Sequence, residues 1–358
     1  MNILLTGGAG YIGSHVVKQL LETTKYNITI LDNLNTGSQK TLDALYKIAA
    51  KELPQTEQSR LSVVIIDLKE FDKISEFLQK QRFDIVMHFA ASIVVPESVE
   101  NPVKYYMNNT VNTTNLIKCS QESGVKKFIF SSTAAVYGEP NQNKSTIDES
   151  CELKPINPYG MSKLMSERIL QDSARANIDF KYLIFRYFNV AGADMNTFGF
   201  GGDCTPRIGE CHEPETHLVP LIAQTALGIR DKFCIYGDDF DTKDGTCIRD
   251  YIHVDDLSDA HIKAIDYLDF NDSDIFNVGY GVGYSVKEVI ETMKKTTKKD
   301  FQVDIVSRRD GDPAYLVADN TNITTKMNWQ PKYNDLELIC QSAYKWESKL
   351  KMYNYNYL

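Results

Sequence analysis

Short apolar runs alternate with longer segments of helical pattern along the first half of the chain. The runs are rich in β-branched residues and lie at residues 3–5, 28–31, 63–66, 85–89 and 128–130. Segments with a helical pattern separate them, at residues 11–22, 71–81 and 102–124. Strands that are hydrophobic throughout and separated by helices are typical of a parallel sheet covered on both faces. The pattern therefore predicts an α/β protein with a doubly wound parallel sheet.

This rhythm becomes irregular after a last strand-like run at residues 182–185. A glycine-rich loop at residues 198–202 and a proline-containing stretch up to Pro220 follow, and such residues mark loops. We expect a first domain at residues 1–188, to which later segments can return, and a smaller α/β domain at residues 189–358. Within the second domain, Ser285 and Glu288 form a capping-box pattern at a helix start, and a last helix is expected from about Asp335 through Trp346.

Composition limits the classes of partner. With 358 residues, 42% of them hydrophobic, the chain can bury a large core in two domains. No stretch approaches the apolar run of about 20 residues that a membrane span needs, and we expect no leader because the sequence starts directly in a strand pattern. The net charge of −9 and the pI near 5.3 disfavour a nucleic-acid surface. We therefore expect neither a nucleic acid nor a membrane as a partner.

The cysteines point to a reducing compartment. They are odd in number and form no CxxC pair, at Cys119, Cys151, Cys204, Cys211, Cys234, Cys247 and Cys340. We expect free thiols and a cytoplasmic location. Cys204 and Cys211 share one loop with His212 and His217, but their spacing matches no zinc pattern, and we predict no metal site. His88 and His253 are interpreted as structural histidines.

A glycine-rich segment at residues 6–13, with the sequence TGGAGYIG, follows the first strand and opens a helix. Its glycines have GxxGxxG spacing, at Gly7, Gly10 and Gly13. Glycine permits a tight turn and lets backbone N–H groups approach a pyrophosphate at a helix N-terminus. Asp32 ends the second strand about 20 residues later, where a carboxylate accepts from ribose hydroxyls and repels a 2′-phosphate. Together they predict a dinucleotide site that prefers NAD to NADP, with Asp67 placed to meet the adenine.

Tyr159 and Lys163 lie four residues apart in an amphipathic helical pattern and so share one helix face. A free tyrosine has a pKa of about 10, so only about one molecule in a thousand is phenolate at pH 7. A neighbouring ammonium favours the phenolate. Thr133 ends the fifth strand, at the sheet edge where ligands bind, and can hydrogen-bond the oxygen that Tyr159 deprotonates. We predict Tyr159 as general base, assisted by Lys163 and Thr133.

Longer motifs give a resemblance to a known family. In order, the chain contains TGGAGYIG, HFAA, FIFSSTAAVYGEP, INPYGMSK and RYFNVAGA, and later HLVPLIAQ, GTCIRDYIHVDDL, FNVGYG and RRDGDPAYLVAD. With these it resembles, nearly end to end, the UDP-glucose 4-epimerase family of extended short-chain dehydrogenases/reductases, whose first domain is a Rossmann fold. The resemblance implies an isomerase with tightly held NAD that oxidises C4 of a UDP-hexose and returns the hydride to the opposite face. It also implies a homodimer whose helices near residues 102–124 and 158–176 pair across a two-fold axis.

The same resemblance implies contact residues, motif by motif. The NAD contacts would be Tyr11, Ile12, Asp32, Asn33, Asp67, Leu68, Phe89, Ala90, Asn108, Lys163 and Phe188. The UDP-sugar contacts would be Asn189, Leu218, Tyr236, Arg249, Arg309 and Asp312, with the two arginines balancing the pyrophosphate charge.

Four positions depart from the family pattern. Ile93 stands where many members have a lysine that helps to bind NAD, and Thr133 replaces a serine. His217 stands where some members have asparagine, and we expect it to contact the substrate. Leu316 stands where glucose-restricted members have a tyrosine, so that a 2-acetamido group would fit. We hypothesise activity on UDP-glucose/UDP-galactose and on UDP-N-acetylglucosamine/UDP-N-acetylgalactosamine, unless a shifted loop lets Tyr315 fill the gap.

Two alternatives are weighed against an epimerase. A nucleotide-sugar 4,6-dehydratase shares the NAD domain and the Tyr/Lys pair, but it needs an acid and a base beside the strand-end hydroxyl, where this chain has Ala134 and Ala135. A non-catalytic NAD-binding scaffold can share the fold, but such proteins often lose the pair that Tyr159 and Lys163 form. The residues retained here favour the epimerase.

Overall fold

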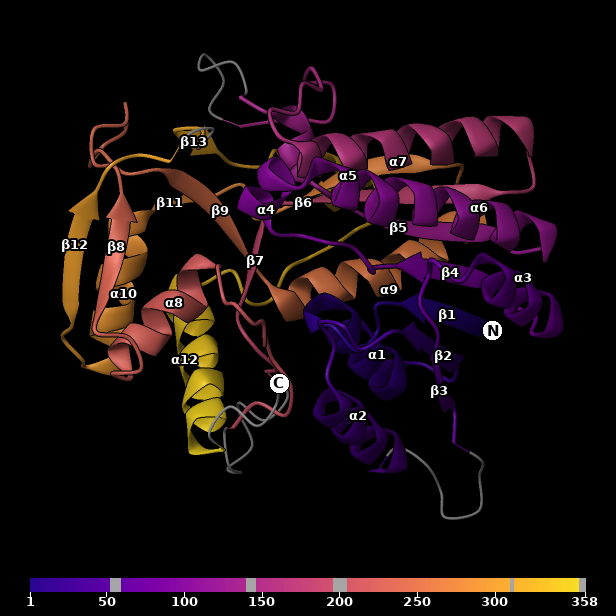
Figure 1. Cartoon of the computed structure of the whole chain (residues 1–358), viewed down its shortest axis with the longest axis horizontal. Helices are drawn as coiled ribbons and strands as arrows, with labels where there is room; N and C mark the ends of the chain where they lie inside the picture. Colours follow the sequence, from indigo (N-terminus) through magenta and orange to yellow (C-terminus); the bar gives the residue numbers. More distant parts are fainter. Residues whose placement is uncertain (52–58, 140–145, 196–204, 310–311, 354–358) are drawn as a thin grey trace. The chain divides into compact units, whose positions relative to one another are not determined.

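The computed structural model describes residues 1–51, 59–139, 146–195, 205–309 and 312–353, which form two compact units (Figure 1). Unit 1 comprises Met1–Gly138, Leu153–Tyr187 and Ser258–Phe276, and unit 2 comprises Glu139–Glu152, Phe188–Leu257 and Asn277–Leu358. Each unit is thus assembled from segments that are separate in the sequence. Residues 198–202, expected as a loop, and Cys204 lie outside the described residues.

A seven-stranded sheet forms the centre of unit 1. Its strands are β1 (Asn2–Thr6), β2 (Asn27–Asp32), β3 (Leu61–Ile65), β4 (Ile85–His88), β5 (Lys127–Thr133), β6 (Lys181–Tyr187) and β10 (Asp274–Val278), in the order β10-β6-β5-β4-β1-β2-β3. The pairings from β6 through to β3 are all parallel. Strands β1 and β4 are buried almost throughout, which explains their uninterrupted apolar sequences. The predicted doubly wound sheet is confirmed.

Helices cover both faces of this sheet. They are α1 (Tyr11–Thr23), α2 (Gln39–Lys51), α3 (Phe71–Lys80), α4 (Val95–Glu100), α5 (Pro102–Tyr105), α6 (Asn112–Glu122), α7 (Pro158–Ala176) and α9 (Val254–Phe270). Figure 1 shows α3, α6 and α7 on one face and α1, α2 and α9 on the other. Leu116 and Leu170 share a core cluster with Val86 and Phe128 of the sheet. The single helix expected at residues 102–124 is instead interrupted by a π-helical turn at Tyr106–Val111.

Unit 2 is built around β9 (Ile248–His253). This strand pairs with β7 (Asn189–Ala191), β11 (Gly283–Ser285) and β13 (Tyr315–Leu316), while β8 (Lys232–Tyr236) pairs with β12 (Gln302–Val306). The helices are α8 (Leu218–Ala226), α10 (Val286–Thr297), α11 (Thr321–Lys326) and α12 (Leu336–Met352). Ser285 and Glu288 form the predicted capping box of α10, and Asp335 caps α12.

Asp250 of β9 fixes the strands of unit 2. Its carboxylate accepts from the backbone N–H groups of Tyr280 at 2.9 Å, Gly281 at 2.8 Å and Ala318 at 3.2 Å. Burial raises the pKa of Asp250 to about 6, and the three N–H donors oppose that rise. A buried carboxylate held by three donors ties the chain after β13 to β9, so that the position of β13 in the sheet is well defined.

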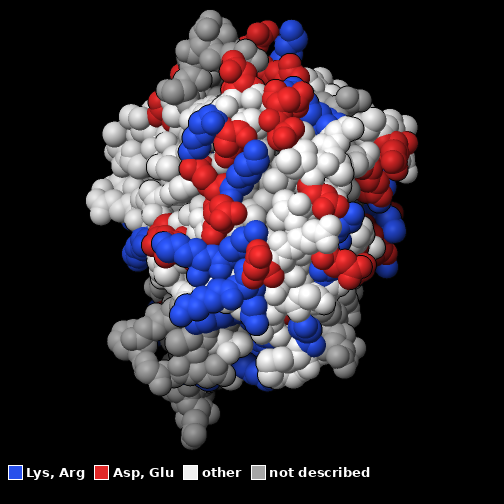
Figure 2. All heavy atoms as spheres, turned by 90° about the vertical axis from the view of Figure 1, so that its left-hand side faces the viewer, with Lys and Arg blue, Asp and Glu red and all other residues white. Residues whose placement is uncertain are grey.

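The surface carries mixed charges. On the face that bears β8, β12 and α10, Figure 2 shows basic side chains interspersed with acidic ones. Near the end of α10, Lys294 pairs with Asp300 at 2.9 Å, and Lys295 pairs with Glu337. Among the described residues, none of the helices has both the length and the apolar character that crossing a membrane requires.

Candidate active site

The glycine-rich loop of unit 1 is packed too tightly for side chains. Gly7 has a φ of +72°, and a Cβ there would lie 2.6 Å from the Ala90 nitrogen. A Cβ on Gly13 would lie 2.3 Å from the Gly7 oxygen. Helix α1 starts after Gly10 with no side-chain cap and no acidic residue in its first turn. The N–H groups of that first turn have no partners within the helix, so they suit an anion such as a pyrophosphate.

Asp32 lies beside this loop. Its carboxylate accepts from the N–H of Ala9 at 2.9 Å and of Leu34 at 2.8 Å. Burial raises the pKa of Asp32, and these backbone hydrogen bonds oppose the rise. Asn33, directly after β2, donates to Asp67, which follows β3, at 3.0 Å. The loop and the three polar side chains fit the phosphate, ribose and adenine of a dinucleotide.

Other residues predicted to contact NAD line the same edge of the sheet. Phe89 and Ala90 follow β4 and adjoin Gly7, and Asn108 donates to Ser92 at 3.0 Å. Ile93, in the same loop, is partly exposed, with a relative accessibility of 36%. Phe188 belongs to unit 2.

His88, at the end of β4, is a structural residue, as predicted. Its ring nitrogens hydrogen-bond the hydroxyls of Thr6 at 2.6 Å and Thr113 at 2.7 Å. Burial lowers the pKa of His88 to about 3, and the nearby Lys163 adds to that effect. The imidazole is therefore neutral at physiological pH.

The Tyr159 phenol and the Thr133 hydroxyl lie near each other. The Thr133 hydroxyl oxygen accepts from the Ala135 N–H at 3.1 Å, so its hydrogen can be donated to another partner. Asn157 caps α7 by accepting from the Gly160 N–H at 2.8 Å, and Gly160 packs against the Ala135 carbonyl with no room for a side chain. Burial raises the pKa of Tyr159, and the nearby Thr133 hydroxyl opposes the rise. Because the first turn of α7 packs directly against Ala135, the Tyr159 phenol lies beside the Thr133 hydroxyl at the end of β5.

Lys163 lies one turn further along α7 and is buried. Its ammonium lies 4.7 Å from the centre of the Phe130 ring. Burial lowers the pKa of Lys163 to about 7, while the carboxylate of Glu167 favours the charged form. Stabilisation of a Tyr159 phenolate by Lys163 stays a prediction, because burial and Thr133 are what shift the Tyr159 pKa here.

In unit 2, charged and aromatic residues predicted to hold the UDP-sugar converge. Arg309 donates to Asp312 at 3.0 Å, and Arg249 lies 3.8 Å from the other oxygen of Asp312. The Arg309 guanidinium lies over the Tyr236 ring, 4.6 Å from its centre. Two arginines within reach of one carboxylate can also bind a diphosphate.

Leu316 lies opposite Arg249. In the parallel pairing of β13 with β9, Leu316 is aligned with Arg249 and Tyr315 with Ile248. Successive side chains of a strand point to opposite faces, so Tyr315 and Leu316 cannot occupy the same space unless the register shifts by one residue. Asn189, in β7, is aligned with Tyr251 of β9.

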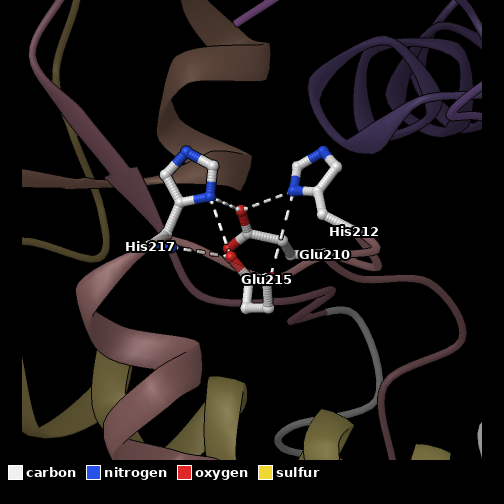
Figure 3. A group of neighbouring side chains, drawn as sticks. All are labelled: Glu210, His212, Glu215 and His217. Atoms are coloured by element: carbon white, nitrogen blue, oxygen red, sulfur yellow. Dashed lines mark hydrogen bonds and ion pairs between the residues drawn. The ribbon is translucent and has the colours of Figure 1, made fainter. Parts of the chain in front are cut away.

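Leu218 and His217 are at the start of α8. Leu218 is the first residue of the helix, and His217 is its N-cap without a capping side-chain hydrogen bond. The His217 Nδ1 instead contacts Glu210 at 2.8 Å and Glu215 at 3.0 Å. The ring nitrogen that is left over, Nε2, points away from these two carboxylates (Figure 3).

Comparison with known proteins identifies the family. A family model described as NAD dependent epimerase/dehydratase family matches residues 3–279. The chain belongs to this family. A UDP-glucose 4-epimerase from Lactobacillus helveticus is 42% identical over 347 residues, which cover 97% of both chains. The structure of the UDP-Glc/GlcNAc 4-epimerase from Campylobacter jejuni is 50% identical with a TM-score of 0.81, covering 97% of this chain and 99% of that one. A UDP-glucose 4-epimerase from Bifidobacterium longum, in complex with NAD+ and UDP, is 34% identical with a TM-score of 0.88 and 98% coverage of each chain.

Membership of the epimerase/dehydratase family confirms several sequence predictions. The motif resemblance to UDP-glucose 4-epimerases, the Rossmann-type fold, the NAD cofactor and the enzyme class of an epimerase are all confirmed. The roles of the individual site residues stay predictions.

Sequence reasoning about this epimerase missed a buried ion pair beneath the predicted catalytic residues. Arg186 of β6 and Glu167 of α7 form a bidentate pair, with N···O distances of 2.7 and 3.1 Å and side-chain exposures of 2% and 0%. Ser132 donates to Glu167 at 2.5 Å, and Arg186 donates to the Tyr137 hydroxyl at 2.9 Å. The only sequence signal is that Glu167 follows Lys163 by one helical turn.

A second missed feature is the π-helical turn that locks onto α7. Asn109 in this turn donates to the Ser162 hydroxyl at 3.1 Å, and its backbone carbonyl accepts from Ser166 at 2.8 Å. Its side-chain oxygen accepts from the Ser92 N–H at 2.8 Å. The turn therefore ties the loop after β4 to the helix that carries Tyr159, and π-turns of this kind often occur at functional sites.

Proposed function

We propose that this protein interconverts the C4 epimers of UDP-hexoses. The observation behind this is the juxtaposition of the Tyr159 phenol with the Thr133 hydroxyl at the carboxyl edge of the NAD-type sheet. The names of the relatives support it, because three of those most similar in sequence are called UDP-glucose 4-epimerases.

The chain's own residues would move the proton. Thr133 donates a hydrogen bond, and Tyr159 takes the proton of the sugar's 4-hydroxyl and later returns it. NAD held at this site would supply reversible hydride transfer at C4 of the sugar. The glycine-rich loop, Asp32 and the Asn33–Asp67 pair would hold that cofactor. Ala134 and Ala135 offer no acid or base for a dehydration.

The residues of unit 2 would hold the nucleotide. Arg249 and Arg309 would bind the diphosphate, because each brings a guanidinium that pairs with phosphate oxygens. Tyr236 already packs against Arg309, so it would fix the orientation of that guanidinium. Asp312, Asn189 and Leu218 would contact the remaining polar and apolar parts of the UDP-sugar.

A direct assay tests the proposal. The purified protein is incubated without added cofactor, separately with UDP-galactose and with UDP-N-acetylgalactosamine, and the products are resolved by chromatography. Conversion of UDP-galactose to UDP-glucose is expected. If UDP-galactose stays unconverted even after NAD is added, the proposed function is wrong.

We propose that the protein also acts on the N-acetylated UDP-hexoses, and that Leu316 is the residue that permits it. This side chain lies on β13 directly opposite Arg249, and the pairing with β9 keeps the Tyr315 side chain on the other face. A leucine there leaves more room than a tyrosine, which suits a 2-acetamido group. A structural neighbour that is 50% identical is called a UDP-Glc/GlcNAc 4-epimerase.

Leu316→Tyr should separate the two activities. The larger side chain is expected to lower kcat/KM for UDP-N-acetylgalactosamine by at least about tenfold while sparing UDP-galactose, because a pocket that is too small rejects the larger substrate. Leu316→Met, which keeps the size, is the matched control and should retain both activities. Equal losses on both substrates in Leu316→Tyr would contradict the assignment.

We also propose a homodimer formed through one face of unit 1. Val103, Met107 and Val111 form an exposed apolar stripe at i, i+4 and i+8, with exposures of 67%, 52% and 36%. Met165 of α7 is also exposed, and it lines an apolar hollow with Thr110 and Met161. Contiguous apolar side chains of this kind mark protein interfaces.

Met107→Glu should prevent that pairing. A carboxylate in an apolar interface is costly to desolvate, so sedimentation should give the mass of a single chain, 40.6 kDa. The control is Met352→Glu, the same change at an exposed methionine at the end of α12, which should leave the dimer intact. A wild-type protein that sediments as a monomer would contradict the proposal.

We further propose a cytoplasmic location. Five of the described cysteines are free: Cys119, Cys211, Cys234, Cys247 and Cys340. Unpaired thiols support a reducing compartment.

A further inference from the structure

Four side chains with metal-binding atoms face one another in the segment before α8. They are Glu210, His212, Glu215 and His217, and one candidate ligand atom from each lies within 4.8 Å of all the others. Figure 3 shows the Nδ1 atoms of both imidazoles turned toward the two carboxylates. The His217 Nδ1 lies 2.8 Å from Glu210 and 3.0 Å from Glu215, and the His212 Nδ1 lies 3.1 Å from Glu210.

A single nitrogen atom, the His217 Nδ1, faces both carboxylates of this cluster. The side chains of Glu210 and Glu215 are only 5% and 4% exposed, so their two negative charges need compensation inside the protein. The His217 Nδ1 carries at most one hydrogen, but it lies within hydrogen-bonding distance of two carboxylate oxygens. A divalent cation in the same position would balance both carboxylates while the two imidazoles stay neutral.

We propose that Glu210, His212, Glu215 and His217 bind one divalent transition-metal ion, preferably zinc, through the two Nδ1 atoms and one oxygen of each carboxylate. With bonds of about 2.1 Å, the ligand atoms of a tetrahedral zinc site lie about 3.4 Å apart. The N···O separations here run from 2.8 to 4.0 Å, so small side-chain shifts reach that geometry. Two nitrogen and two oxygen donors suit zinc, whereas magnesium and calcium prefer oxygen alone.

The backbone holds two of these ligands in place before any ion binds. Glu215 Oε1 accepts from the N–H groups of Thr216 and His217, both at 2.7 Å. The carbonyl of Glu210 accepts from the Trp346 indole at 2.6 Å. Ligands that are oriented by such outer contacts lose less entropy on binding the ion.

The proposed ligands differ from the group of Cys204, Cys211, His212 and His217 that the sequence places in one loop, because they include no cysteine. Cys211 lies in the same segment but packs against the apolar cluster of Ala193, Trp346 and Leu350. The ion would therefore be held by nitrogen and oxygen alone. Because His217 directly precedes Leu218, the ion would also fix the start of α8.

Zinc binding to the full-length protein tests the proposal. After treatment with a chelator and its removal, titration with zinc chloride in a calorimeter should show one equivalent bound per chain. Glu210→Gln should weaken binding by at least about tenfold, since even outer-shell changes cost that much. Glu213→Gln makes the same change at an exposed residue of the same segment and should bind like the wild type. Cobalt(II) should give d–d absorption bands without a thiolate charge-transfer band.

Several outcomes would overturn this site. They are a wild-type protein that binds no zinc, a Glu210→Gln variant that binds as tightly as the wild type, and a Cys211→Ser variant that loses the metal. If Glu210→Gln proves unfolded by circular dichroism, His212→Asn, which removes a partly exposed ligand, decides by the same criterion. Metal binding is measured without substrate, so the result does not depend on the epimerase activity.

Discussion

Tyr159→Phe is expected to lower kcat for UDP-galactose by about 10²–10⁴-fold, the usual loss on removing a general base. The change deletes one oxygen and keeps the buried ring, so the fold should be unaffected. The NAD content of the purified variant should equal that of the wild type, which would separate a loss of chemistry from a loss of cofactor.

Tyr105→Phe is the matched control. The Tyr105 ring packs edge-on to Tyr159, with 6.5 Å between the ring centres, but its hydroxyl hydrogen-bonds the Val94 carbonyl at 2.6 Å and Glu97 at 2.8 Å. Removing this hydroxyl should leave kcat near the wild-type value. An undiminished rate in Tyr159→Phe would show that another group is the base.

Glu167→Gln should be the most destabilising of the changes considered for this protein. The substitution keeps the shape but removes the charge that compensates Arg186, whose side chain is 2% exposed. Leaving a buried guanidinium uncompensated should lower the free energy of unfolding by about 3–5 kcal/mol, measured by urea denaturation. The same replacement at Glu122, which forms an exposed pair with Lys118 at 3.8 Å, should change stability little.

The same variant should also affect the pH dependence of the reaction. The Glu167 carboxylate favours the protonated form of Lys163, so its removal lowers the pKa of Lys163 below the present value of about 7. Lys163 would then lose its proton at a lower pH, and the alkaline limb of the kcat/KM profile should move in the same direction. A Glu167→Gln variant with wild-type stability and an unchanged profile would contradict both expectations.

Structural elements that depend on residues close together in the chain could be predicted from the sequence. The helix expected at residues 158–176 coincides with α7, and the Ser285 capping box is present, because both depend on neighbours within one or two turns. Strand ends differ from the predictions by up to three residues. The largest difference is at the end of β5, where polar residues such as Thr133 pair in the sheet without belonging to an apolar run.

Features that depend on distant residues were not predictable in this way. Glu167 and Arg186 pair only because α7 packs against β6, and nothing in either segment indicates the partner. The π-turn at Asn109 follows from contacts with Ser92 and Ser162 rather than from its own residue types. The register that aligns Leu316 with Arg249 depends on the hydrogen bond from the Ala318 N–H to Asp250. The identity of the residue at position 316 does not reveal that register.

The assembly of each unit from separate segments has a consequence for the making of the protein. Unit 1 includes Ser258–Phe276, and β10 (Asp274–Val278) is the edge strand next to β6. The sheet around the glycine-rich loop is therefore incomplete until the ribosome has synthesised more than three quarters of the chain, although domains generally fold as units during synthesis. A fragment that ends near residue 188 would expose the edge of β6 and lack His261, whose ring lies 4.9 Å from that of Phe89. We therefore expect unit 1 to fold only when the chain extends through β10, and a shortened or fused form of the protein would have to retain that strand.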